Sequence, residues 1–246
     1  MPNYRFTLEY DGAGFAGWQA QASEQRTVQG EFEAAIERVT GQRLRVSAAG
    51  RTDAGVHALG QVASARIRTE LPPAVLQRAL NHTLPGDLVV VAAERAADDF
   101  HARYSAVGKL YCYRVWNDGV RSPLRSARVH WVARKLDVFA MSKAAEAFVG
   151  RHDFAALQAA GSEVKSTVRT LKRLEIEQES PGVLLFWAEA DGFLRHMVRN
   201  LAGTLLEVGS GRRSIESMTE LLACGDRRRA GPTAPAVGLT LVRVFY

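Results

Sequence analysis

The sequence predicts a mixed α/β fold of the α+β kind, made of two similar halves with mainly antiparallel sheets. Short runs alternate apolar and polar residues, which is typical of strands with one buried face. Other segments carry apolar residues at helical spacing. In both halves these segments follow the order of ferredoxin-like split-βαβ units. The chain has 246 residues, 47% of them hydrophobic, and is long enough to bury two such cores.

The first half contains four strand-like runs and two helical segments. Thr27 is a candidate N-cap for the first helix, because a threonine side chain can accept a hydrogen bond from the first helical turn. A proline at the start of the second helix fits the same logic. The predicted elements are a strand at 4–10, a helix at 27–39, strands at 44–49 and 61–67, a helix at 72–80 and a strand at 88–93.

The second half can be divided in the same way, and a Ser-Pro-Gly turn joins its two middle strands. Two stretches rich in Arg, Gly, Ser and Pro, 117–136 and 209–237, are predicted surface loops. We expect domains at 1–105 and 106–246, with an active-site cleft between the halves. The predicted elements are a strand at 109–116, a helix at 137–149, strands at 169–177 and 183–189, a helix at 193–208 and a strand at 239–245.

The charge of the chain is uneven. Its formal net charge is +6, with 27 Arg against 5 Lys; residues 1–104 carry −1 and residues 105–246 carry +7. Guanidinium groups bind phosphate with two parallel hydrogen bonds, so a basic, arginine-rich half fits a nucleic acid. Replacement of Lys by Arg through genome composition explains the arginine bias equally well.

Cysteine usage and hydropathy indicate the cellular setting. Cys112 and Cys224 lie far apart without a CxxC motif, which favours neither a disulfide scaffold nor a zinc site. No apolar run approaches the ~20 residues of a membrane span, and no signal peptide is evident. We therefore expect a cytoplasmic protein without a membrane partner.

The segment Gly12–Gly17 matches the G-x-G-x-x-G pattern of dinucleotide-binding proteins, which would make the chain an oxidoreductase. Helical spacing begins only at Thr27, however, whereas that motif needs a helix opening at the loop. The glycines fit better with a close backbone approach, either to the protein's own sheet or to a polyanion.

The segment at 50–62, GRTDAGVHALGQV, holds Arg51, Asp53 and His57 between two predicted strands. A carboxylate beside a guanidinium stays ionised and can act as a nucleophile or base. An Asp–Arg pair that only pins the loop is the alternative. A metal site would need further ligands near Asp53 and His57, and the sequence offers none at suitable spacing.

Two other groups of polar residues allow two interpretations of their role each. Asp98, Asp99 and His101 could ligate a metal, although they precede the join of the halves, where ion-paired linkers are common. Arg195 and Arg199 share one helix face at i, i+4 spacing and are either solvated or form a clamp for phosphate or carboxylate.

These motifs together resemble the tRNA pseudouridine synthase A family. The resemblance covers almost the whole chain and is weakest in the two predicted loops. Besides GRTDAGVHALGQV it rests on EYDGAGFAGWQAQ at 9–21, NHTLPGD at 81–87, DDFHARYSAVGKLYCYRV at 98–115, FLRHMVRNLAGTLLEVG at 193–209 and VGLTLVRV at 237–244.

The resemblance implies an isomerase that converts uridine to pseudouridine in the anticodon stem-loop of tRNA, at positions 38, 39 and 40. It implies a homodimer without metal or organic cofactor. Asp53 would be the nucleophile, Arg199 its partner and Tyr111 the ring that packs on the target base. Leu239 would supply an apolar wall, and Arg51 would help to hold the base out of the stack.

The main alternative from another class is a non-catalytic RNA-binding protein. The combination of Asp53, Tyr111 and Arg199 argues against it, because binding alone does not need a carboxylate among phosphates. The sequence leaves open whether the aspartate attacks C1′, attacks C6 or removes the C2′ proton.

Overall fold

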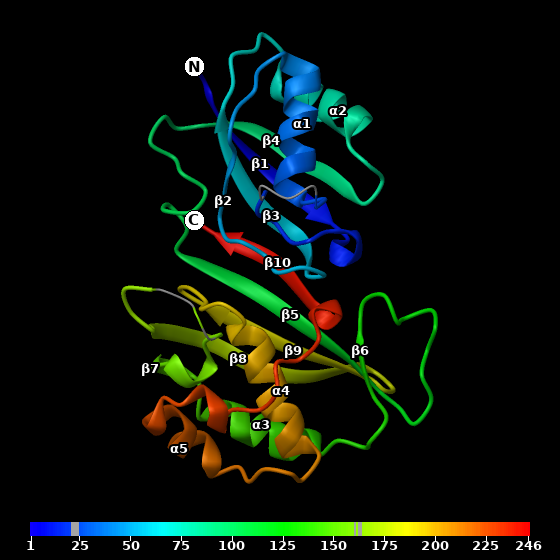
Figure 1. Cartoon of the computed structure of the whole chain (residues 1–246), viewed down its shortest axis with the longest axis vertical. Helices are drawn as coiled ribbons and strands as arrows, with labels where there is room; N and C mark the ends of the chain where they lie inside the picture. Colours follow the sequence, from blue (N-terminus) through cyan, green and yellow to red (C-terminus); the bar gives the residue numbers. More distant parts are fainter. Residues whose placement is uncertain (21–24, 160, 162–163) are drawn as a thin grey trace. The chain divides into compact units, whose positions relative to one another are not determined.

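The computed structural model describes residues 1–20, 25–159, 161 and 164–246, and contacts among them divide the chain into two units. The first unit comprises Met1–Val107 and Thr240–Tyr246, and the second comprises Gly108–Leu239. Gln21, the last residue of the EYDGAGFAGWQAQ segment, lies outside the described residues. Each unit is described by itself, with the labels of Figure 1.

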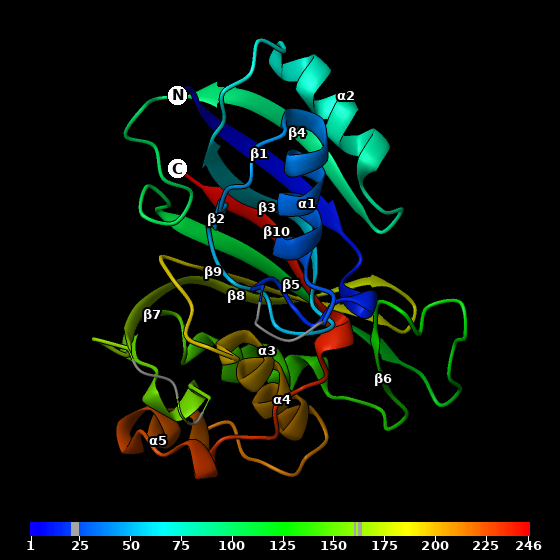
Figure 2. The same cartoon turned by 45° about the horizontal axis from the view of Figure 1, so that its top comes forward.

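The first unit has an antiparallel sheet in which β1 lies between β3 and β4. The short β2 pairs with one end of β3, and β10 runs parallel to the other end. Two helices, α1 and α2, accompany this sheet (Figures 1 and 2). The elements are β1 (Asn3–Tyr10), η1 (Gly12–Gly14), α1 (Val28–Thr40), β2 (Ser47–Ala48), β3 (His57–Arg66), α2 (Pro73–Thr83), β4 (Leu88–Ala96) and β10 (Leu239–Phe245).

Helix α1 begins and ends as its sequence predicts. The Thr27 side chain accepts a hydrogen bond from the Gly30 N–H, which confirms the predicted N-cap. Gly41 ends the helix with a φ of +68°, in the left-handed region that favours glycine. The buried face of α1 includes Phe32, whose ring meets Phe6 of β1 edge-on at 5.2 Å. This contact belongs to the core of the first unit.

Helix α2 is bound to β4 through side-chain amides. Asn81 accepts a hydrogen bond from the Val90 N–H at 2.7 Å and donates to the Val90 carbonyl at 2.9 Å. Gln77 donates to the carbonyls of Val90 and Val91 at 3.0 and 2.7 Å. The backbone of β4 is therefore hydrogen-bonded on one side to β1 and on the other to the helix.

The second unit has an antiparallel sheet in the order β5-β9-β8-β7, with the short β6 parallel to β5. Gly182, with a φ of +78°, closes the turn between β8 and β9. Helices α3 and α4 pack together on one face (Figure 1). The elements are β5 (Gly108–Asn117), β6 (His130–Val132), α3 (Val138–Glu146), β7 (Gly150–Asp153), η2 (Ala155–Leu157), β8 (Val168–Ser180), β9 (Val183–Ala190), α4 (Met197–Gly209), α5 (Ser217–Cys224), η3 (Arg227–Arg229) and η4 (Ala236–Gly238).

The predicted α/β class with mainly antiparallel sheets is confirmed, but several boundaries are wrong. The strand at 44–49 shrinks to β2, and β3 begins four residues earlier than the predicted 61. Helix α4 begins at Met197 rather than 193, because His196 has a φ of +62°. The predicted loop at 209–237 contains α5, and that at 117–136 contains β6.

The last strand groups with the first unit. The sequence division at residues 105 and 106 leaves this strand in the second half, whereas β10 from Thr240 onward groups with the first unit. Thr240 and Leu241 pair in parallel with His57 and Ala58 of β3, which explains the grouping.

Among the described residues, no helix combines the length and the apolar character that crossing a bilayer requires.

Candidate active site

The GRTD segment forms the loop that leads from β2 into β3 of the first unit. A second segment, residues 12–18, runs against this loop and is hydrogen-bonded to it. The Trp18 N–H donates to the Thr52 carbonyl at 3.0 Å, and the Gly55 N–H donates to the Phe15 carbonyl at 3.3 Å. The loop is therefore held by main-chain contacts on both sides of Asp53.

Glycines make this close approach possible. A Cβ at Gly17 would lie 2.8 Å from the Thr52 carbonyl oxygen, and Gly17 has a φ of +99°. A Cβ at Gly12 would collide with the Val56 backbone. Gly12–Gly14 form a short 3-10 helix, and α1 starts only at Val28. The glycines thus approach the protein's own chain, and the strand–loop–helix geometry of a dinucleotide site is not formed there.

A buried hydrogen-bond network lies beneath the loop. The Tyr10 hydroxyl is 2.8 Å from the Thr52 hydroxyl, and the Gln61 amide donates to the Tyr10 hydroxyl at 3.4 Å. Gln61 also donates to the Gly50 carbonyl at 2.8 Å. Burial raises the pKa of Tyr10 to about 12, so its hydroxyl keeps its proton at neutral pH. Strands β1 and β3 are thereby linked to both residues that flank Arg51.

The two charged side chains of the loop, Arg51 and Asp53, are accessible to solvent. Arg51 is exposed and Asp53 is partly exposed, whereas the intervening Thr52 is buried. The anchored Thr52 leaves its two charged neighbours accessible to a substrate. His57 is buried, and its Nδ1 accepts a hydrogen bond from the Gly12 N–H at 3.1 Å and lies 3.1 Å from an Asp11 carboxylate oxygen.

In the second unit, Tyr111 lies on β5 and is buried. Its ring meets Phe193 edge-on, with ring centroids 5.1 Å apart. Phe193 belongs to the four predicted helical residues that instead precede α4. The strand and the segment before α4 are thus in contact at Tyr111.

Arg199 lies in the first turns of α4 and is tied to residues 233–235. Its Nε donates to the Ala234 carbonyl at 2.7 Å, and the Ala234 N–H donates to the Arg199 carbonyl at 3.1 Å. The Tyr113 hydroxyl donates to the neighbouring Pro235 carbonyl at 2.9 Å. Burial raises the pKa of Tyr113, and the nearby positive charge of Arg199 lowers it by a smaller amount.

Leu239 follows the same segment and is buried. The preceding Gly238 lies so close to Tyr113 that a Cβ there would be 2.9 Å from the ring. In the second unit, Arg199 and the segment that precedes Leu239 therefore both lie near Tyr113. Tyr113 is two residues beyond Tyr111 on β5. Arg51 and Asp53 belong to the first unit, and Tyr111, Arg199 and Leu239 to the second.

Arg227 is a residue of this region that the sequence did not single out. Its guanidinium donates to the Asn200 side-chain oxygen and to the Thr233 hydroxyl, both at 3.0 Å, and to the Gly231 carbonyl at 2.9 Å. Asn200 in turn donates to the Leu157 carbonyl. Arg227 thus fixes the segment that Arg199 binds. Its position within the Arg227-Arg228-Arg229 run gave no signal of this role.

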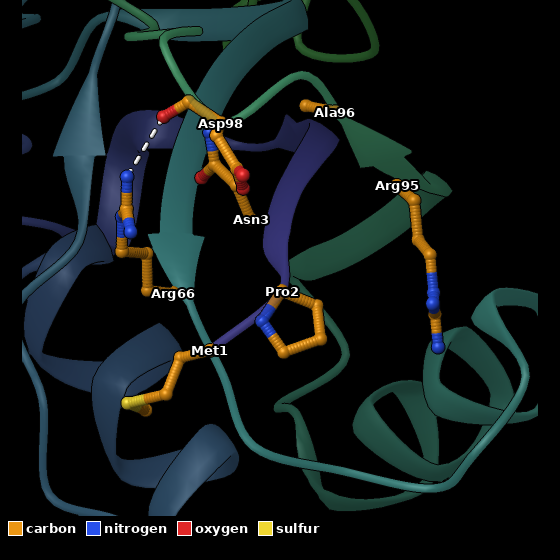
Figure 3. Close-up of a pocket in the computed structure, with 7 residues that line it drawn as sticks. All are labelled: Met1, Pro2, Asn3, Arg66, Arg95, Ala96 and Asp98. Atoms are coloured by element: carbon orange, nitrogen blue, oxygen red, sulfur yellow. Dashed lines mark hydrogen bonds between the residues drawn. The ribbon is translucent and has the colours of Figure 1, made fainter.

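A polar hollow of about 410 Å³ lies elsewhere in the first unit (Figure 3). The figure shows Arg66 and Arg95 on opposite sides of Pro2, with Arg66 hydrogen-bonded to the Asp98 carbonyl at 2.8 Å. Asn3, which lines it, pairs with Arg66, whereas Tyr10 at the other end of β1 pairs with Ala58. The hollow is therefore at the end of the sheet opposite to the GRTD loop.

The metal reading of Asp98, Asp99 and His101 finds no support in the geometry. Within residues 1–20, 25–159, 161 and 164–246, no three His, Cys, Asp or Glu side chains gather as metal ligands would. His101 uses Nδ1 to accept hydrogen bonds from the N–H groups of Arg103 and Tyr104, at 3.1 and 3.3 Å.

Comparison with known proteins identifies the family. A family model described as tRNA pseudouridine synthase matches residues 7–105 and 144–246. tRNA pseudouridine synthase A of Myxococcus xanthus is 48% identical over all of this chain and 92% of its own length. The protein of the same name from Moorella thermoacetica is 46% identical over the full length of both chains. The chain therefore belongs to the tRNA pseudouridine synthase A family, a family of isomerases.

Proposed function

We propose that this protein isomerises uridines 38, 39 and 40 in the anticodon stem-loop of tRNA, with Asp53 as the nucleophile. The observation that carries the proposal is the GRTD loop itself. It presents a partly exposed carboxylate, while its neighbour Thr52 is buried and bonded to Tyr10. A carboxylate on a loop fixed in this way is pre-positioned for chemistry.

The reaction needs no electrons from outside. The N1–C1′ bond breaks, the freed uracil turns, and C5 bonds to C1′. C5 then loses its proton and N1 gains one, so atoms and charge balance. A carboxylate can promote these reaction steps by attacking C1′, by attacking C6 or by removing the C2′ proton. All three routes require an ionised Asp53, and the proposal accordingly includes no metal or organic cofactor.

The remaining residues bind the substrate or stabilise charge. Arg199 favours the ionised form of the aspartate. Tyr111 stacks on the uracil, Leu239 contacts it as an apolar surface, and Arg51 helps to keep the base out of the helical stack. A base inside a stem must flip out before reaction, which costs a few kcal/mol, and an aromatic or guanidinium face offsets part of that cost. The active protein is a cytoplasmic homodimer.

The test is tritium release from unmodified tRNA labelled at uridine C5. The C5 hydrogen leaves only when pseudouridine forms, so we expect release to a plateau set by the uridines at 38–40. A transcript with cytidine at these three positions is the matched control and should release nothing. Tight tRNA binding without release would instead identify a non-catalytic RNA-binding protein. Equal release from both transcripts would place the target uridines elsewhere.

A further inference from the structure

The segment between β4 and β5 carries an unusually exposed aromatic ring. Tyr104 is 77% exposed, more than any other aromatic side chain in the described part of the chain. His101 stacks on it, with ring centroids 4.4 Å apart and planes inclined by 33°. The guanidinium of Arg103 lies 5.7 Å from the Tyr104 ring centroid. We call these three side chains the aromatic platform.

The platform is held in place by the chain around it. His101 accepts hydrogen bonds from the backbone of Arg103 and Tyr104, and the Ser105 N–H donates to the His101 carbonyl at 2.9 Å. The Ser105 hydroxyl accepts from the His101 N–H at 3.1 Å. The turn is therefore closed in both directions, and little conformational entropy remains to be lost when something binds to it.

The rest of the unit anchors this turn. The Ala102 N–H donates to the Ser64 hydroxyl at 3.0 Å, and the Ala102 carbonyl accepts from the Tyr246 hydroxyl at 2.8 Å. Asn3 donates to the Ala97 and Phe100 carbonyls, both at 2.8 Å. Strands β1 and β3 and the C-terminal residue thus fix the platform from three sides.

The platform lies far along the sheet from the GRTD loop. Ser64, its anchor, is seven residues beyond His57 on β3. A strand rises about 3.3 Å per residue, so the two points are roughly 20 Å apart. Whatever binds the platform is therefore not the uridine that reacts at Asp53, although a tRNA is large enough to reach both.

The chemistry of the platform fits a nucleobase. Aromatic rings that leave one face open stack on unpaired bases, and an adjacent arginine attracts the anionic backbone. His101 lies against the Tyr104 ring and the Arg103 guanidinium lies near it, yet Tyr104 remains 77% exposed and so accessible to a further ring. We propose that the aromatic platform stacks on an unpaired nucleobase of the tRNA other than the target uridine. The inference rests on the proposed function for its substrate but not on the role of Asp53.

The test compares tRNA binding by Tyr104→Ala and the wild-type protein across a range of salt concentrations. A lost base stack should weaken binding roughly 5- to 150-fold. Stacking releases no counterions, so the dependence of affinity on salt should keep its slope. Arg103→Gln should instead flatten that slope by about 0.9, the value of one phosphate contact. Tyr104→Trp should bind tRNA with an affinity close to that of the wild type, in contrast to Tyr104→Ala. The fluorescence of the introduced tryptophan should change when tRNA binds.

Phe139→Ala supplies the matched control, because Phe139 is 72% exposed and lies on α3 of the second unit. It should bind tRNA like the wild type. Tyr104→Ala binding within twofold of the wild type would overturn the proposal. So would a change of oligomeric state in Tyr104→Ala, measured by analytical ultracentrifugation, because the ring would then be a contact between protein chains. Binding requires no turnover, so these results stand apart from the tritium-release test.

Discussion

The hydroxyl groups of Tyr10 and Thr52 lie 2.8 Å apart in the buried interior of the first unit, although 42 positions separate them in the sequence. Thr52 directly precedes Asp53, so this hydrogen bond connects strand β1 to the residue beside the proposed nucleophile. Removing the Tyr10 hydroxyl leaves the Thr52 hydroxyl without this partner, and the loop loses one of its fixed points.

We expect Tyr10→Phe to lower the free energy of unfolding by about 1 kcal/mol, the usual net value of such a hydrogen bond. It should also lower kcat more than it raises KM, because the loop is less well positioned. Tyr4→Phe is the matched control: among the described residues the buried Tyr4 hydroxyl has no hydrogen-bond partner, so its removal should not destabilise. Denaturant unfolding and steady-state kinetics on both variants decide the matter, and equal effects would refute a positioning role.

Asp53→Asn should abolish turnover while tRNA affinity stays within a few fold of the wild type. The amide keeps the shape of the side chain but is not a nucleophile, and phosphate contacts elsewhere provide most of the affinity. Asp99→Asn, which alters an exposed carboxylate of the same unit, should remain active. Tritium release and filter binding measure the two quantities. Near wild-type turnover in Asp53→Asn would exclude it as the nucleophile.

Tyr111 allows ring and hydroxyl to be separated. Tyr111→Phe should bind tRNA normally and turn over slowly if the hydroxyl takes the C5 proton, a transfer that typically contributes about 10²–10⁴-fold. Tyr111→Ala should also weaken retention of the flipped base. If the ring is only a packing partner of Phe193, both variants should melt at lower temperature and Tyr111→Phe should be fully active. Single-turnover rates and melting temperatures distinguish these cases.

The Arg26–Asp87 pair predicts an acid-dependent part of the stability. Two hydrogen bonds of 2.7 Å join the guanidinium to the carboxylate, and they hold the pKa of Asp87 below its ordinary value. The stabilisation is therefore complete above about pH 4, the unfolded-state value, and is lost as the pH falls through the lower folded-state pKa. Both side chains are about one-third exposed, so we expect only about 0.5–1 kcal/mol.

Asp87→Asn should accordingly be less stable than the wild type at pH 7, with the difference closing below pH 4. Asp226 is the control. Arg228 holds the pKa of Asp226 at about 2, but the two residues are only two positions apart in the sequence and the Arg228 side chain is 90% exposed, so the unfolded chain can form the same pair. Urea unfolding at pH 7 and pH 3 should show no difference between Asp226→Asn and the wild type. A constant gap for Asp87→Asn across this range would contradict the ion-pair explanation.

The loop between β5 and β6 offers a test of phosphate binding in the basic second unit. Arg121, Arg125 and Arg128 are exposed, and the Arg125 guanidinium lies 4.6 Å from the centroid of the Trp116 ring. Reversing the three charges should weaken binding of all tRNA substrates alike and flatten the salt slope by about 0.9 per lost contact. Reversing the exposed Arg38, Arg43 and Arg78 of the first unit makes the same change in net charge and serves as the control. An unchanged slope would show that the loop is only a solvated surface.

Local patterns predicted the fold well where a short stretch of sequence decides the conformation. Thr27 caps α1 as expected, and Gly182 closes the predicted hairpin turn. Helix α5 was missed because it is only eight residues long and buries Met218 and Leu221, too few apolar residues for a clear period. The predicted start of α4 was wrong because His196 adopts a left-handed backbone conformation. Neither the type of this residue nor the spacing of the apolar residues around it indicates that conformation.

In the candidate site too, features that depend on neighbouring residues could be predicted, and features that depend on distant residues could not. The Asp53 loop can be recognised from the sequence because the residues that define it follow one another within a single short segment. The Tyr10–Thr52–Gln61 network is not, since its members come from two strands and a loop, and only the register of β1 against β3 brings them together. Arg227 was missed for a similar reason: a run of three arginines resembles a solvated surface, yet one of them holds the Asn200 and Thr233 side chains.

The hydrogen bonds from Gln77 and Asn81 to β4 have a consequence for solubility. A strand with unbonded N–H and C=O groups along one side is a template on which another chain can add a strand and begin to aggregate. Along β4 the α2 amides occupy both polar backbone groups of Val90 and the carbonyl of Val91. A foreign strand would first have to displace them. Helix α2 thereby protects this side of the sheet chemically as well as sterically, and mutations that remove its amides should favour self-association before they unfold the protein.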